Sequence, residues 1–130
     1  MSAEMTALGL AALLQAVQIG LAGASMNRDT GPRWNAGPRD DSPPLSPMTG
    51  RLRRAVDNHF EGLILFTIAV VLVVFWDRTS PLTVLCAWLY LAARVLYVPA
   101  YAFGWSPWRS LIWAVGFVAT LAMILIALFT

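Results

Sequence analysis

The residues best suited to chemistry are polar side chains embedded in apolar stretches of the chain. They form two rows whose members are three or four residues apart and therefore share one face of a helix. The first row is Arg54, Asn58 and Glu61, and the second is Arg94, Tyr97 and Tyr101. Arg109 and Ser110 follow at the start of the next apolar stretch. Together these residues are the candidate site.

These side chains match a small ligand that carries charges of both signs. Guanidinium groups bind carboxylates through two parallel hydrogen bonds, and Arg54, Arg94 and Arg109 provide such groups. Glu61 is suited to an ammonium group, whereas Asn58 and the tyrosines supply neutral hydrogen bonds. The match is a small zwitterion with more than one carboxylate. Glutathione, with two carboxylates, one ammonium and a thiol, is such a molecule.

Four long apolar stretches position these residues. The chain is 58% hydrophobic and 12% charged, against roughly 25% charged in ordinary globular domains. Each stretch is near the ~20 residues that cross ~30 Å of hydrocarbon, and the apolar runs are continuous, which favours helices over a barrel. We predict a single domain over 1–130, an all-α integral membrane protein folded as a four-helix antiparallel bundle. The helices are expected at about 4–26, 48–76, 81–103 and 107–129, with a cytoplasmic loop at 27–47.

The pairs Ser46-Pro47 and Ser106-Pro107 are typical of helix starts, because a capping hydroxyl is followed by proline at the first helical position. Thr49 is the alternative cap for the second helix. The second helix is expected to begin after Ser46 and the fourth after Ser106.

The distribution of arginines predicts the orientation in the membrane. The first connection and the residues just after it hold most of the arginines, the third connection holds Arg109, and the second holds only Arg78. Because basic residues are retained in the cytoplasm, the first and third loops are expected there, with both termini outside. A formal net charge of +2 argues against nucleic-acid binding. The lone cysteine, Cys86, has no metal-ligand spacing around it, so no metal site is predicted.

In this arrangement the two polar rows converge at the cytoplasmic end of the bundle. Arg94 lies seven residues before Tyr101, about 10 Å inside the helix at ~1.5 Å per residue. A charge at that depth costs at least ~2.5 kcal/mol unless it is paired or hydrated, and Glu61 is the expected partner. The alternative is that Glu61 and Arg94 only neutralise each other and fix the register of two helices. His59 directly follows Asn58, so it is expected on a different face, at the headgroup level or in a subunit contact.

With these motifs the sequence resembles the membrane-associated proteins in eicosanoid and glutathione metabolism, the MAPEG family, and is most similar to its bacterial branch. In the second helix the residues that match the family's Arg-Ala, Asn, Glu pattern are Arg54-Ala55, Asn58 and Glu61. In the third and fourth helices the matching residues are Arg94, Tyr97, Tyr101 and Arg109. The resemblance extends from the first predicted span to the last.

The resemblance implies a homotrimer in a bacterial inner membrane, with glutathione as co-substrate at the subunit interfaces. The residues that match the glutathione-binding positions are Arg54, Asn58, Glu61, Arg94, Tyr97 and Tyr101. Arg109 matches the arginine that holds the thiolate, and Ser110 matches a serine that follows it in one family member. The partners implied are further copies of the chain, membrane lipids and a lipophilic small molecule.

The function that the resemblance implies is a membrane-embedded glutathione-dependent transferase or peroxidase acting on lipophilic electrophiles. A free thiol has a pKa near ~8.5, and a cation such as Arg109 beside the sulfur favours the reactive thiolate. The alternative is a non-catalytic membrane binder of a lipophilic ligand or partner protein, since the family contains such members. The chain departs from some relatives at Tyr97 and Asp57, and its first helix offers only Gln15 and Gln18 where some relatives supply an arginine.

Overall fold

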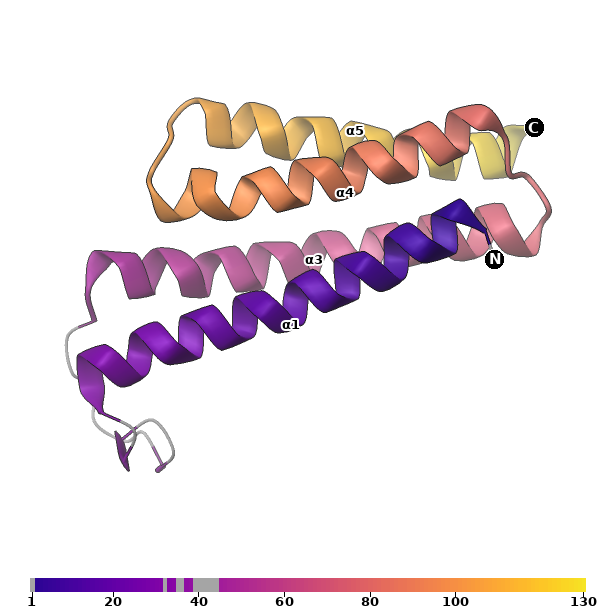
Figure 1. The fold of residues 1–130 in the computed structure, drawn as a ribbon. Helices are drawn as coiled ribbons and strands as arrows, with labels where there is room; N and C mark the ends of the chain where they lie inside the picture. Colours follow the sequence, from indigo (N-terminus) through magenta and orange to yellow (C-terminus); the bar gives the residue numbers. More distant parts are fainter. Residues whose placement is uncertain (1, 32, 35–36, 39–44) are drawn as a thin grey trace.

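The chain folds into long antiparallel helices. The computed structural model describes residues 2–31, 33–34, 37–38 and 45–130. Its long helices are α1 (Ala3–Thr30), α3 (Pro47–Phe75), α4 (Pro81–Ala102) and α5 (Trp108–Phe129). α1 lies beside α3 and α4 beside α5, with both termini at the same end (Figure 1). Each helix is long and apolar enough to cross a membrane, and the described residues include no strand. The predicted all-α membrane bundle is confirmed.

The starts of the helices follow local capping chemistry. The hydroxyl of Ser46 accepts a hydrogen bond from the backbone N–H of Thr49 at 3.2 Å, with Pro47 at the first helical position, as predicted. The predicted cap at Ser106 is wrong. Pro107 precedes the first residue of α5 and no side chain caps the helix. The N–H of Arg109 instead meets the carbonyl oxygen of Trp105 at 2.8 Å, so a backbone group supplies the acceptor.

The first helix is longer than predicted and ends at Thr30 rather than near residue 26. Gly31, with φ of 91°, terminates it and donates its N–H to the carbonyl of Asn27. The carboxylate of Asp29 accepts hydrogen bonds from the N–H of Ser46 and the hydroxyl of Thr49. These contacts join the end of α1 to the start of α3, which a local apolar pattern does not reveal. The predicted loop at 27–47 lies partly outside the described residues.

α3 and α4 are the central helices, because each contacts all three of the others. Between them the rings of Phe66 and Tyr90 stack at a centroid distance of 3.9 Å. Small buried residues such as Ala11 and Ala87 let the helices approach closely. Many large apolar side chains face outward, among them Leu13 at 64% exposure, as expected for a surface in contact with lipid. The first polar row lies on α3 and the second on α4, so both rows belong to the central pair of helices.

The helices differ in length. α1 and α3 contain 28 and 29 residues, whereas α4 and α5 contain 22 each. At ~1.5 Å per residue the longer pair extends about 10 Å further, and Figure 1 shows it projecting where α4 leads into α5. This end carries Arg28, Arg51, Arg53, Arg54 and Arg109, and is called the basic end below.

Candidate functional site

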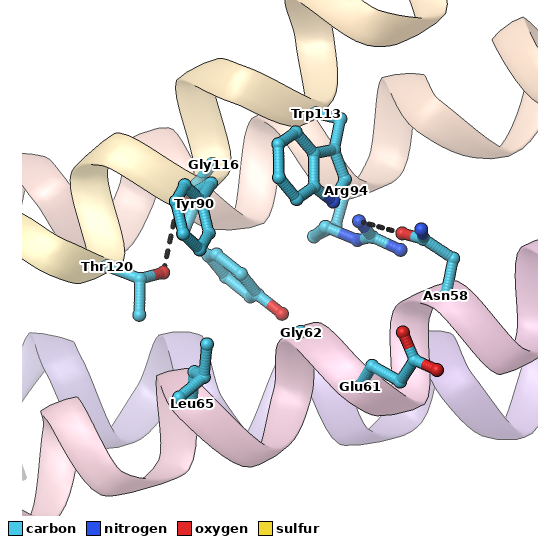
Figure 2. Close-up of a pocket in the computed structure, with 10 residues that line it drawn as sticks. Asn58, Glu61, Gly62, Leu65, Tyr90, Arg94, Trp113, Gly116 and Thr120 are labelled. Carbon is cyan, nitrogen blue, oxygen red and sulfur yellow. Dashed lines mark hydrogen bonds between the residues drawn. The ribbon is translucent and has the colours of Figure 1, made fainter.

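Two neighbouring cavities lie among α3, α4 and α5, toward the basic end. The outer cavity has a volume of about 460 Å³ and is lined by Asn58, Tyr97, Tyr101, Arg109, Ser110, Trp113 and Ala114. The inner cavity has a volume of about 160 Å³, and its polar lining residues are Asn58, Glu61, Tyr90, Arg94, Trp113 and Thr120 (Figure 2). Asn58 and Trp113 line both cavities, so the two share a wall.

The outer cavity is positively charged. The guanidinium of Arg109 lies 4.7 Å from the ring centroid of Tyr101, and that of Arg54 lies 5.8 Å from the same centroid. The Nε–H of Arg54 also donates to the Tyr101 hydroxyl at 3.1 Å. Of the residues that the structure describes, no aspartate or glutamate lines this cavity. An aromatic ring that holds two cations beside an acid-free cavity favours an anionic ligand.

Arg94 is the most deeply buried of the predicted site residues that carry a charge, with 3% of its surface exposed. Its Nη1 donates to the side-chain oxygen of Asn58 at 2.9 Å, and its guanidinium lies 4.4 Å from the ring centroid of Tyr97. Its Nη2 is buried and has no hydrogen-bond partner in the structure. A buried cation with an unsatisfied donor is costly, so Arg94 lacks an acceptor that a bound ligand could supply.

The expected ion pair between Glu61 and Arg94 is absent. Both residues are described, yet the guanidinium bonds to the neutral side chain of Asn58, one helical turn from Glu61. Figure 2 shows the Glu61 carboxylate at the side of the inner cavity, apart from the guanidinium. Glu61 is exposed at the edge of this cavity. The two residues therefore place opposite charges on one cavity without neutralising each other.

His59 was predicted at the headgroup level or in a subunit contact. It is instead fully buried within the bundle, at 0% exposure. Its Nε2 lies 3.0 Å from the carbonyl oxygen of Ala11 on α1, and its Nδ1 accepts from the Nε–H of Arg94 at 3.3 Å. The prediction failed because it assigned α3 a single buried face, whereas α3 packs against three helices. The signal was a histidine within an apolar span, where an ionisable side chain is expensive without a partner.

The structure brings most of the predicted residues together. Asn58, Tyr97, Tyr101, Arg109 and Ser110 line the outer cavity, while Glu61 and Arg94 line the inner one with Asn58. Arg54 lines neither cavity and is exposed, but it reaches the outer one through Tyr101. Gln15 and Gln18 are buried on α1 and line neither cavity.

Tyr90 and Trp113 are lining residues outside the predicted site set. Tyr90 is 2% exposed, and its buried hydroxyl has no partner in the structure. It precedes Arg94 by four residues and thus extends the second polar row by one turn, a spacing that could have identified it. Trp113 follows Arg109 by four residues in the same way.

Comparison with known proteins identifies the family. No curated protein and no solved structure is significantly similar to the chain. The sequence model of the MAPEG family matches residues 4–129, which is nearly the whole chain. The chain therefore belongs to the MAPEG family.

Proposed function

We propose that the chain binds glutathione in the outer cavity and is a transferase or peroxidase for lipophilic electrophiles. The MAPEG family includes glutathione transferases and peroxidases. The observation that carries the proposal is the outer cavity itself, which is free of acidic residues among those described and holds Arg109 beside Ser110. Its volume of about 460 Å³ falls within the ~300–1,000 Å³ of small-molecule sites.

Arg109 is the residue assigned to the thiol. A cation about 4 Å from a sulfur at an effective dielectric of about 20 favours the anion by up to about 4 kcal/mol. Arg109 is only half-buried, so solvent reduces this toward the ~1.4 kcal/mol of a single pKa unit. The hydroxyl of Ser110, which lines the same cavity, is suited to donate a hydrogen bond to the sulfur. In a transferase the thiolate sulfur then bonds to the electrophilic carbon of the second substrate, and the leaving group departs with the electron pair of the broken bond. In a peroxidase the sulfur attacks a peroxide oxygen, the O–O bond breaks to release the alcohol, and a second glutathione converts the resulting sulfenic acid to the disulfide and water.

The inner cavity is the proposed site for part of that second substrate. At about 160 Å³ it is smaller than typical small-molecule sites, so it suits a fragment rather than a whole glutathione molecule. Its apolar lining includes Leu65 and Phe117, each more than one third exposed on the outside of the bundle. A lipophilic molecule therefore has a path from the bilayer to the wall that the two cavities share.

Orientation and assembly are part of the same proposal. The concentration of arginines at the basic end supports a cytoplasmic location for that end, with both termini outside. The inner membrane of a bacterium is the proposed location. Family membership supports a homotrimer, and native mass spectrometry of the detergent-purified protein would test it.

Calorimetric titration of the detergent-purified protein with glutathione tests the central proposal. Wild type is expected to release heat on binding. Arg94→Ala is expected to lose most of it, because one carboxylate of glutathione in the outer cavity is proposed to extend past Asn58 to the unpaired Nη2 of Arg94. Arg54→Ala should bind about tenfold more weakly, since a hydrogen bond to a charged group contributes about 1.5 kcal/mol. Arg53→Ala is the matched control, because Arg53 lines a separate cavity between α1 and α3, whereas Arg54 reaches the outer cavity through Tyr101.

The outcome decides between the two functions. Binding by wild type and by Arg53→Ala, with weaker binding in Arg54→Ala and loss in Arg94→Ala, supports the glutathione site. Absence of heat with wild type would contradict it and favour a non-catalytic binder of a lipophilic ligand or partner protein.

A further inference from the structure

His59 lies behind the inner cavity and lines neither cavity, yet it contacts the one buried cation among the predicted site residues. We propose that His59 is a positioning residue, which fixes the guanidinium of Arg94 so that its Nη2 is the donor left for a ligand. This inference rests on the proposed function and adds to it that one carboxylate of glutathione extends from the outer cavity, past the shared wall of Asn58 and Trp113, to Nη2 of Arg94 in the inner cavity.

The two partners of His59 determine its protonation and tautomer. A carbonyl oxygen only accepts, so the Nε2 that faces Ala11 at 3.0 Å must carry a proton. A guanidinium only donates, so the Nδ1 that faces the Nε–H of Arg94 at 3.3 Å must have a free lone pair. Only the neutral imidazole protonated at Nε2 satisfies both contacts. The ring therefore links the backbone of α1 to a side chain of α4.

Each side-chain nitrogen of Arg94 then has a different hydrogen-bonding environment. Nε is held by His59 and Nη1 by Asn58, both residues of α3, and Nη2 is buried without a partner. An arginine side chain carries about 2 kcal/mol of rotamer entropy when free. Two hydrogen bonds and the contact with the Tyr97 ring order it before any ligand arrives. Such preorganisation strengthens binding without a direct contact between His59 and the ligand.

Two substitutions separate this role from simple packing. In His59→Asn the amide oxygen takes roughly the place of Nδ1, so the acceptor for Arg94 is kept and the donor to Ala11 is lost. In His59→Gln the amide nitrogen takes roughly the place of Nε2, so the donor to Ala11 is kept and the acceptor for Arg94 is lost. Both variants remove a ring that is fully buried, and both are therefore expected to be less thermally stable than wild type.

The glutathione affinity of the two variants is the first measurement. A positioning role predicts a dissociation constant within about twofold of wild type for His59→Asn and about tenfold weaker for His59→Gln. Turnover at saturating glutathione should be unchanged in both, because Arg109 and Ser110 rather than Arg94 contact the sulfur. Equal weakening in both variants, or none in either, overturns the inference.

A second measurement does not depend on glutathione. In protein labelled with ¹⁵N-arginine, the Nε–H resonance of Arg94, identified by its disappearance in Arg94→Lys, reports the contact with His59. The resonance should be preserved in His59→Asn and displaced in His59→Gln. If wild type fails to bind glutathione while this pattern holds, the proposed function fails but His59 still positions Arg94. If the resonance is unchanged in His59→Gln, the positioning role is refuted whether or not glutathione binds.

Discussion

Replacing Tyr90 with phenylalanine should stabilise the unliganded protein. Tyr90 is 2% exposed, and its buried hydroxyl has no hydrogen-bond partner in the structure. A buried polar group without a partner costs about 1–3 kcal/mol. Tyr90→Phe removes that cost and keeps the ring, including its stack on Phe66 at 3.9 Å. Because the lost oxygen leaves a small void, we expect a net gain of about 1 kcal/mol.

Thermal unfolding in detergent, followed by circular dichroism, measures this gain. For a chain of this size 1 kcal/mol corresponds to a rise in Tm of about 3–6 °C. Tyr101→Phe is the matched control, since the Tyr101 hydroxyl accepts a hydrogen bond from Arg54 and its loss should not raise the Tm. If Tyr90→Phe lowers the Tm as much as the control does, the hydroxyl has a partner in the protein and the reasoning fails. If glutathione stabilises wild type more than Tyr90→Phe, the ligand uses this hydroxyl.

Three further predictions concern other parts of the bundle. Arg109→Ala should lower turnover about 10- to 100-fold, because the pKa of the bound thiol rises by one to two units. Calorimetry should show that glutathione binding is retained. Loss of binding with unchanged turnover at saturating glutathione would contradict the role of Arg109 at the sulfur. Gly62→Ala places a methyl group 3.4 Å from the Tyr90 hydroxyl, which is an ordinary van der Waals contact in the inner cavity. The variant should raise KM for a bulky lipophilic electrophile and leave glutathione affinity unchanged. Gly9→Ala is the control, because the added methyl group meets nothing within 4 Å. At the opposite end, Glu4 is 1% exposed and accepts hydrogen bonds from the hydroxyls of Thr79 and Thr83. Glu4→Ala should therefore lower the free energy of unfolding by about 1–3 kcal/mol, and Glu4→Gln, which keeps an acceptor, should lower it less.

The helices and the polar rows could be predicted because they depend on local properties of the chain. Hydropathy over a span sets the membrane helices, and the capping hydroxyl of Ser46 acts within one turn. The spacing within each row places Asn58 and Tyr97 on the right faces of α3 and α4. The end of α1 could not be predicted in this way, because the contacts of Asp29 with Ser46 and Thr49 are made across the loop.

The partners of Arg94 show where sequence reasoning was insufficient. Charge complementarity alone favoured Glu61, but the guanidinium of Arg94 donates hydrogen bonds to Asn58 and His59 instead. Which of several polar groups on one helix a long side chain meets depends on the rotation and separation of two packed helices. The acceptor for His59 is a backbone carbonyl on α1, and no side-chain pattern marks such a group.

The unequal helix lengths have a consequence for how two very different molecules could meet. The ~10 Å by which α1 and α3 extend past the shorter pair forms a step at the basic end, and Arg54 lies on α3 near that step. Under the proposed function, glutathione enters from water beside the step. The lipophilic substrate enters from the bilayer past Phe117, which lines the inner cavity and is more than one third exposed. The proposed reaction would then take place at the wall of Asn58 and Trp113, which line both cavities.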